Sequence, residues 1–224
     1  MPAPAPRPLP DQISELTTGR LSVYLRCLEV LEEEGLQTIS SGGLAERFHL
    51  NAALIRKDLA YFGEFGVRGV GYFVKDLRRH LRQILGLDRR YKVAILGAGN
   101  LGCALADYAG FRQDGFLVVG MFDVAAEKVG RLVRGGLVVR HVRELGDVVR
   151  EPGVDIAVVT VPRQAAQDVV TQVAEAGIRA VLNFASGTVR VPDGVRLKNV
   201  DLSVSLETLS FFLAQGEAHG DDSP

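Results

Sequence analysis

Long apolar runs are missing from this chain of 224 residues. No stretch approaches the ~20 apolar residues that a membrane-spanning helix needs. The proline-rich start of the chain also lacks the apolar segment of a signal peptide, so we expect a disordered arm over residues 1–12 and a cytoplasmic location. Hydrophobic residues make up 47% of the chain and charged residues 24%, which allows a substantial core and argues against global disorder.

Cysteine is scarce as well. The two cysteines, Cys27 and Cys103, fall in separate expected helices, which gives no disulfide framework. Cys103 follows a glycine motif at the start of a helix, where a thiolate would be stabilised, so a redox role is one interpretation. Packing of a small residue is the other, and we favour it because a low pKa is only one condition for a redox thiol.

An excess of charge of either sign is also absent, since the formal net charge is only −1. The charges are unevenly distributed, however. Residues 47–90 contain ten Lys or Arg against four Asp or Glu, whereas residues 91–224 contain 13 against 16. The neutral total therefore hides a basic segment, as expected for a module that meets nucleic acid.

Three helices are expected in and before the basic segment, and the second and third are short and separated by a three-residue turn. A first helix, from Ile13, carries leucines at three- and four-residue steps. Ser40 and Ser41 are candidate N-caps for a second helix, and a third begins at Ala52. This spacing predicts a helix-turn-helix whose second helix lies in a DNA major groove, and we assign residues 13–88 to a winged-helix DNA-binding domain.

Two features of this domain carry cations. On the third helix, Arg56 and Lys57 project near the middle while the apolar residues pack inward, so they can meet phosphates or base edges. Residues 64–72 then form two short apolar runs with glycines at the turn, which predicts a wing with Arg68 and Gly69 near its tip. An arginine on a narrow wing suits a minor groove.

The alternative for these cations is a solvated surface. Arg56-Lys57-Asp58 would then be an exposed helix face with an internal ion pair, and Arg68 an exposed turn residue. We favour DNA contact because the basic segment, the helix spacing and the wing all point to the same function.

A second constellation follows a short apolar strand, residues 93–96. It consists of Gly97, Ala98, Gly99, Asn100, Leu101 and Gly102. Gly97 permits a tight turn, Gly99 lets the backbone approach a pyrophosphate, and Gly102 lets helix and strand pack closely. Asp123, at the end of the next strand, can accept hydrogen bonds from both ribose hydroxyls and would repel a 2′-phosphate, so NAD is favoured over NADP. The alternative is a purely structural glycine turn.

Strands and helices alternate around this motif, which predicts a Rossmann-like parallel sheet over residues 89–200. The helix after the glycines is expected to end at Gly110 with three larger side chains on one face. That face comprises Leu101, Leu105 and Tyr108. Because ligands bind beyond the carboxyl ends of parallel strands, Val161, Pro162 and Asn183 are second-tier cofactor contacts, although each could equally be ordinary loop chemistry.

The closing segment, residues 201–215, has an apolar stripe on one helical face. It comprises Leu202, Leu206, Leu209, Phe212 and Leu213, with Phe211 beside it. A single Rossmann domain has little surface left to cover this stripe, so we expect a dimerisation helix that is exchanged between subunits. Docking on its own domain is the alternative. Residues 216–224 are expected to be loose.

Groups that could turn over a substrate are few. The Rossmann domain and tail contain two histidines and three lysines, His141, His219, Lys92, Lys128 and Lys198. None falls beside a strand end at the glycine turn, where Tyr108 and Asp201 are the better-placed ionisable groups. A dehydrogenase would also need a substrate-binding domain. We therefore expect no catalytic residue, metal or membrane partner; a small NAD-dependent oxidoreductase and a CoA- or nucleotide-binding module are the alternatives.

Eight stretches, spread over residues 21–213, form a pattern. They are Tyr24-Leu25-Arg26, Ile55-Arg56-Lys57-Asp58-Leu59, Tyr61-Phe62-Gly63-Glu64-Phe65-Gly66, Arg68-Gly69-Val70-Gly71-Tyr72, the glycine motif, Ala106-Asp107-Tyr108, Asn183-Phe184-Ala185 and Val200-Asp201-Leu202-Ser203. Together they resemble the redox-sensing transcriptional repressor Rex family. The chain departs from the family pattern at Ser186 and Ser205, where proline and glutamate are common.

The resemblance implies an α/β homodimer: an N-terminal winged helix-turn-helix domain on operator DNA, a Rossmann-like parallel-sheet domain that binds NADH or NAD⁺, and a C-terminal dimerisation helix. NADH would release the repressor, while NAD⁺ would leave it bound or compete with NADH. The site residues that the resemblance implies are Arg56, Lys57 and Arg68 for DNA, residues 97–102 and Asp123 for the cofactor, and Arg26, Tyr108 and Asp201 for a polar relay between nicotinamide and the DNA-binding domains.

Overall fold

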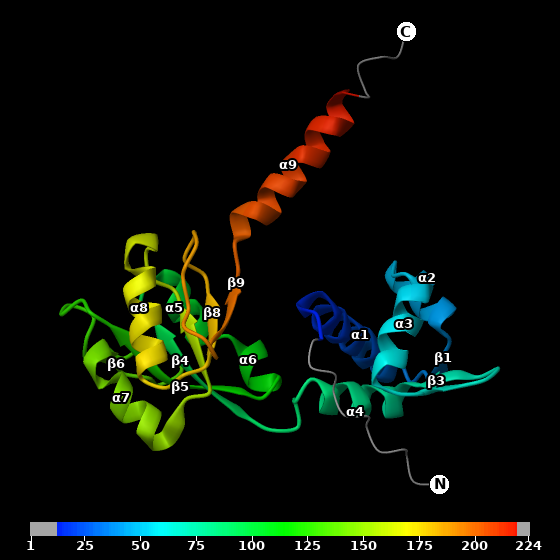
Figure 1. Cartoon of the computed structure of the whole chain (residues 1–224), viewed down its shortest axis with the longest axis horizontal. Coiled ribbons are helices and arrows are strands. Elements are labelled where there is room, and N and C mark those ends of the chain that lie inside the picture. Colours follow the sequence, from blue (N-terminus) through cyan, green and yellow to red (C-terminus); the bar gives the residue numbers. More distant parts are fainter. Residues whose placement is uncertain (1–12, 219–224) are drawn as a thin grey trace. The chain divides into compact units, whose positions relative to one another are not determined.

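The computed structural model describes residues 13–218, so the expected arm over residues 1–12 and the end of the expected tail lie outside the described residues. The chain divides between Arg89 and Arg90 into two compact units, the N-terminal unit and the C-terminal unit (Figure 1). Over the described range, no helix is long and apolar enough to cross a membrane.

Two helices build the core of the N-terminal unit. α1 (Glu15–Glu33) and α4 (Val74–Ile84) place leucines at three- and four-residue steps, and these side chains are buried in one cluster. They are Leu21, Leu25, Leu28, Leu31, Leu77 and Leu81. α4 also supports the segment before the wing, because the rings of His80 and Phe65 pack with their centroids 5.1 Å apart.

The helix-turn-helix consists of α2 (Ser41–Phe48) and α3 (Ala52–Phe62). Each helix begins at a capping side chain: the oxygens of Ser40 and Asn51 each accept a hydrogen bond from the backbone N–H three residues later, at 2.9 and 3.0 Å. α2 ends at His49, which adopts the left-handed conformation with a φ of 53°. Both helices and the short turn agree with the prediction.

A small sheet carries the wing. β2 (Gly66–Val67) and β3 (Gly71–Phe73) pair antiparallel, and β1 (Thr38–Ile39) pairs antiparallel with the other edge of β3. Gly71 has a φ of +94°, and a Cβ there would lie 2.5 Å from the carbonyl oxygen of Ile39. Glycine is therefore required where the two strands approach, and the predicted hairpin is confirmed.

The C-terminal unit is a six-stranded sheet in which every neighbouring pair is parallel. In sheet order the strands are β6 (Val139–His141), β5 (Phe116–Asp123), β4 (Tyr91–Leu96), β7 (Ile156–Val159), β8 (Ala180–Asn183) and β9 (Arg196–Asn199). Most of these strands are runs of β-branched and other apolar residues, as expected for a parallel sheet buried on both faces. The Rossmann-like architecture that we predicted is confirmed.

Helices cover both faces of this sheet (Figure 1). Along β4, Val93 and Ile95 pack in one cluster with residues of the helix after the glycines, whereas Ala94 and Leu96 pack on the other face with valines of α8. The helical segments in chain order are α5 (Asn100–Ala106), α6 (Ala109–Gln113), the short η1 (Val142–Glu144), α7 (Leu145–Val148), η2 (Val149–Gly153) and α8 (Arg163–Glu175).

The helix after the glycine motif is shorter than predicted. α5 ends at Ala106, and Tyr108 caps a separate helix, α6, instead of lying on a face with Leu101. The ring of Tyr108 lies over Gly110, where a Cβ would come within 2.5 Å of it, so this packing requires a glycine. The expectation of one helix that ends at Gly110, with Leu101 and Tyr108 on a shared face, was therefore wrong; both side chains are exposed, at 40% and 58%.

The last helix, α9 (Leu202–Ala218), begins at the predicted position. Its large apolar side chains, which include the predicted stripe, are 57% to 70% exposed in the single chain. They are Leu202, Val204, Leu206, Leu209, Phe211, Phe212 and Leu213. The stripe is therefore not covered by its own chain, which was the alternative to a dimer contact.

Candidate nucleotide and DNA sites

The glycine turn joins β4 to α5 and is closely packed at two of its three glycines. Gly97 has a φ of +109°, and a Cβ there would lie 2.7 Å from the carbonyl oxygen of Thr160. A Cβ on Gly102 would lie 2.0 Å from the carbonyl oxygen of Gly97. Gly99 differs, because a Cβ there would meet nothing within 4 Å. The fold therefore requires the first and third glycines. The second faces open space in which a ligand pyrophosphate could approach the protein backbone.

Thr160, directly after β7, fastens this turn. Its hydroxyl lies 2.9 Å from the carbonyl oxygen of Gly97 and 3.2 Å from that of Leu96, and its backbone N–H donates to the same Leu96 oxygen at 2.8 Å. On the other side, the N–H of Gly97 donates to the carbonyl of Phe122 in β5 at 2.8 Å. The sequence analysis missed Thr160, since nothing in its local pattern reveals a contact 63 residues away.

Asp123 lies at the end of β5 and also holds the turn. Its Oδ2 accepts hydrogen bonds from the backbone N–H of Ala98 at 2.8 Å and from Lys128 Nζ at 3.0 Å, and its Oδ1 accepts from the N–H of Ala125 at 2.9 Å. Burial raises the pKa of this carboxyl, but the three hydrogen bonds outweigh burial, and the net pKa is lowered. Asp123 is therefore an anchored carboxylate whose charge is offset by Lys128, a partner that we had not assigned to the site.

The second-tier positions beyond β7 and β8 differ in availability. Val161 is half-buried and Pro162 is exposed where α8 begins. The side chain of Asn183, in contrast, is fully buried: its amide donates to the carbonyl of Ala185 at 3.0 Å and to Asn199 Oδ1 at 2.9 Å, and its oxygen accepts from the N–H of Ala185. Asn183 thus shapes the loop after β8, which was the alternative to a cofactor contact.

The remaining members of the motif are placed at the start of α5. Ala98 is half-buried in the turn, while Asn100 and Leu101 are exposed in the first turn of the helix. Ala98 is held by the hydrogen bond from its N–H to Asp123, whereas Asn100 and Leu101 follow Gly99 directly in the chain with exposed side chains.

The predicted DNA contacts are exposed in the N-terminal unit. Arg56 Nη1 on α3 donates to the hydroxyl of Ser41 on α2 at 2.9 Å, which directs the guanidinium toward the start of the helix-turn-helix. Lys57 is exposed beside it, and Arg68 and Gly69 are exposed between the wing strands. Gly69 has a φ of +80°, so the wing tip turns through a conformation that favours glycine.

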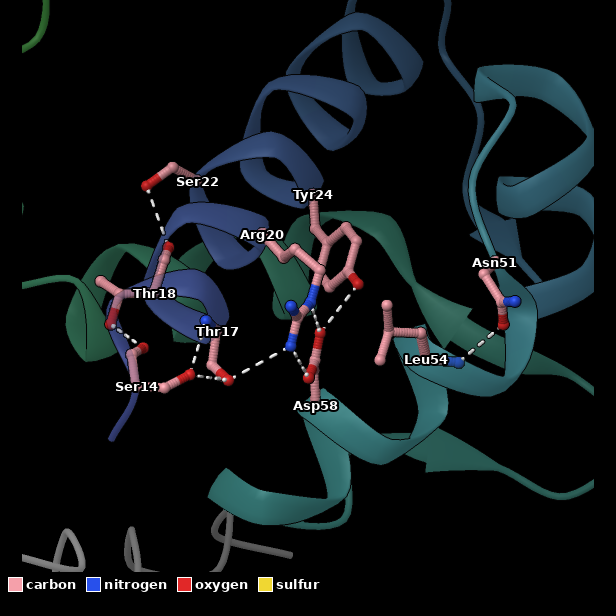
Figure 2. A network of polar contacts seen from close by, with 9 residues as sticks. All are labelled: Ser14, Thr17, Thr18, Arg20, Ser22, Tyr24, Asn51, Leu54 and Asp58. Carbon is pink, nitrogen blue, oxygen red and sulfur yellow. Dashed lines mark hydrogen bonds and ion pairs between the residues drawn. The ribbon is translucent and has the colours of Figure 1, made fainter. Parts of the chain in front are cut away.

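The neighbouring Asp58 points toward α1 and is only 4% exposed (Figure 2). Its carboxylate accepts two hydrogen bonds from Arg20 of α1, from Nε at 2.6 Å and from Nη2 at 2.7 Å, and one from the hydroxyl of Tyr24 at 2.9 Å. The hydrogen bonds from Arg20 lower the pKa of Asp58, and burial together with Asp58 raises that of Tyr24 to about 12. The suggested ion pair within Arg56-Lys57-Asp58 was wrong, because the carboxylate is turned inward.

The three relay residues contact their own elements. Arg26 on α1 pairs with Glu29 at 3.1 Å, and its side chain is 58% exposed. The ring of Tyr108 packs edge-on against Phe111, with 5.3 Å between centroids. Asp201 caps the start of α9, where its Oδ1 accepts from a backbone N–H at 2.9 Å. The relay itself therefore stays a prediction.

Neither cysteine forms a disulfide. Cys27 is buried in the N-terminal core, and burial raises the pKa of its thiol. Cys103 is half-buried and packs against the sheet. Over residues 13–218 no cluster of three His, Cys, Asp or Glu side chains could hold a metal ion.

The N-terminal unit has an exposed helix-turn-helix, and the C-terminal unit has an open glycine turn at the carboxyl end of a parallel strand. Together they define a DNA-binding protein with a nucleotide-type Rossmann domain. Family descriptions match in the same order. Residues 12–60 match the family described as "Putative DNA-binding protein N-terminus", and residues 88–187 match the "CoA binding domain".

Curated proteins named "Redox-sensing transcriptional repressor Rex" are similar over nearly the whole chain. The protein from Carboxydothermus hydrogenoformans is 48% identical over 200 residues, which are 89% of this chain and 96% of that protein. The protein from Pelotomaculum thermopropionicum is 47% identical over 207 residues, or 92% and 97% of the two chains. This chain belongs to the family of redox-sensing transcriptional repressors named Rex.

Solved structures agree. RSP in complex with β-NAD⁺ and operator DNA matches with a TM-score of 0.87 at 38% identity, covering 95% of this chain and 97% of RSP. RSP in complex with β-NADH matches with a TM-score of 0.85 at 36% identity, covering 96% and 100%. The family resemblance and the fold class are confirmed, and because the relatives are named as repressors, so is the expectation that the chain is not an enzyme.

Proposed function

We propose that this chain represses transcription as a homodimer on operator DNA, that NADH releases it, and that NAD⁺ leaves it bound. The observation that carries the proposal is that RSP, which matches both units of this chain, has been solved with β-NAD⁺ and operator DNA and also with β-NADH. A repressor works where the chromosome is, so we place it in the cytoplasm.

The nucleotide site of this proposal is the edge of the sheet around the glycine turn. The dinucleotide pyrophosphate approaches the backbone at Gly99. Asp123 meets the adenosine ribose through Oδ1, which accepts one hydrogen bond within the chain whereas Oδ2 accepts two. Exposed Pro162 and half-buried Val161 border the same edge. The residues we assign are Gly97, Ala98, Gly99, Asn100, Leu101, Gly102, Asp123, Val161 and Pro162.

The DNA site of this proposal is the exposed side of α3 together with the wing. Arg56 and Lys57 face the major groove, and Arg68 and Gly69 at the wing meet the minor groove. Dimeric helix-turn-helix proteins bind two half-sites on double-stranded DNA, and the uncovered stripe of α9 gives a second copy of this chain a surface to bury.

Coupling between the sites needs two arrangements of the dimer with different affinity for NADH. A ligand shifts such a balance only through that difference, and a hundredfold difference supplies about 2.7 kcal/mol. By likeness to the family, Arg26, Tyr108 and Asp201 form the polar relay, with Tyr108 and Asp201 near the nicotinamide.

The test is binding of the purified protein to a labelled operator fragment, here the operator of the RSP complex, with NAD⁺ or NADH added. We expect retention of DNA with NAD⁺ and release with NADH. Equal retention with both nucleotides would refute the sensor, and no binding under either condition would refute operator recognition of that sequence.

CoA is a second candidate ligand, because residues 88–187 match the CoA binding domain description. Both ligands carry an adenosine pyrophosphate, which the glycine turn could accept. Competition decides between them: if CoA displaces bound NADH at a lower concentration than NAD⁺ does, CoA becomes the preferred ligand.

A further inference from the structure

The Asp58 carboxylate is the one acidic group on α3, and it faces α1 instead of solvent (Figure 2). Arg20 and Tyr24 stand one turn apart on α1, so their side chains leave the same face of the helix and converge on it. All three hydrogen bonds are 2.9 Å or shorter. The next residue toward the N-terminus of α3 is the exposed cation Lys57.

Resting on the proposed repressor function, we propose that Arg20, Tyr24 and Asp58 position the recognition helix, so that they set operator affinity and pass movements of α1 to α3. We name this group the α1–α3 clamp. Its members touch no DNA in this account; they act through Arg56 and Lys57.

Direction distinguishes the clamp from the leucine core around it. The buried apolar face of α3 already sets which side of the helix is turned to the core, but apolar contacts have no preferred bond angle and restrict small rotations of the helix less sharply. A guanidinium that donates from two nitrogens to one carboxylate fixes both distance and angle. Because Lys57 and Asp58 are adjacent on one helix, fixing the angle of Asp58 fixes the direction in which the cations leave the surface.

The same geometry allows α1 to transmit movements from Arg26 to α3. Arg26, the residue that the family likeness assigns to the relay, lies on the same continuous helix as Arg20 and Tyr24. Because α1 is unbroken from Glu15 to Glu33, we expect a displacement at Arg26 to reach the clamp and, through Asp58, the recognition helix.

Tyr24→Phe and Asp58→Asn test the clamp. Tyr24→Phe removes one hydrogen bond and keeps the ring in the core, so the domain is expected to fold. Asp76→Asn is the matched control, because Asp76 pairs with Arg79 on the surface of α4 at 3.2 Å with both side chains 59% exposed. Three quantities are measured on the full chain: operator affinity with NAD⁺, the factor by which NADH weakens it, and NADH affinity without DNA.

We expect Tyr24→Phe to weaken operator binding about two- to tenfold, as the loss of one hydrogen bond would, and Asp58→Asn to weaken it more. The NADH factor should shrink in both variants, while NADH affinity without DNA and every property of Asp76→Asn stay at the wild-type values. Unchanged operator affinity and an unchanged NADH factor, with only a lower melting temperature, would overturn the clamp, since that is what a purely structural network gives. If wild-type protein showed no NADH factor at all, the proposed sensor would fail instead, and operator affinity would still decide the positioning role.

Discussion

Two aspartates, Asp58 in the N-terminal unit and Asp123 in the C-terminal unit, are held by hydrogen bonds that lower the pKa of their carboxyl groups. Each joins elements far apart in the sequence: Asp58 lies 38 residues from Arg20, and Asp123 lies 25 residues from Ala98. At the residue scale, these carboxylates organise the surfaces that we assign to DNA and nucleotide.

Their pKa values predict how stability depends on acid. A lowered folded-state pKa adds to the free energy of unfolding above the ordinary aspartate value of about 3.9, and this contribution is lost as the pH falls below that value toward the folded-state pKa. Urea unfolding at pH 5 and pH 3 should therefore show wild type losing more stability than Asp58→Asn, which has no such carboxyl to protonate. An equal loss in both proteins would contradict the assigned pKa shift.

Gly99 supplies a second residue-scale prediction. A Cβ there meets nothing in the chain, so Gly99→Ala should fold with an unchanged melting temperature. If a pyrophosphate approaches this backbone, the methyl group should weaken NADH binding about tenfold, which corresponds to roughly 1.4 kcal/mol. Gly146→Ala in α7, where a Cβ also meets nothing within 4 Å, is the control and should bind NADH normally. Normal binding by Gly99→Ala would remove the pyrophosphate from this position.

At the scale of elements, the sequence was sufficient to predict helices and strands that depend on local residue patterns. The candidate cap Ser40 and the apolar spacing of the helices predicted the helix-turn-helix, and the alternation of strands with helices predicted the parallel sheet. It was insufficient where a distant contact decides. The roles of Thr160 and Arg20 depend on partners 63 and 38 residues away.

Lys128, the ion-pair partner of Asp123, also affects the preference for NADH over NADPH. Lys128 offsets the charge of Asp123, the residue expected to repel a 2′-phosphate. Lys128→Met leaves that charge uncompensated, so the ratio of NADPH affinity to NADH affinity should fall about two- to fivefold, the range expected for a partly exposed ion pair. Fluorescence titrations with both nucleotides measure the ratio. A rise in this ratio would show that Asp123 does not face the ribose.

At the scale of the whole molecule, α9 is the surface through which we propose that two copies of the chain assemble. Its exposed apolar side chains need a partner in water, and a second copy of the chain supplies an identical face. Leu206→Glu combined with Leu209→Glu should therefore halve the mass measured by light scattering. The double variant should also bind the operator more weakly, because a monomer has one DNA-binding domain and can contact only one half-site. Glu207→Gln, on the same helix, should leave the mass unchanged. A dimer that persists in the double variant would move the interface elsewhere.

The central claim is that NADH and operator DNA each weaken the binding of the other to this protein. Coupling between two ligands is reciprocal, so operator DNA must weaken NADH binding by the same factor by which NADH weakens operator binding. The most direct test is the NADH dissociation constant measured with and without saturating operator. We predict an increase of about tenfold or more, the same as the factor seen for DNA; an NADH affinity that operator DNA leaves unchanged would contradict the account.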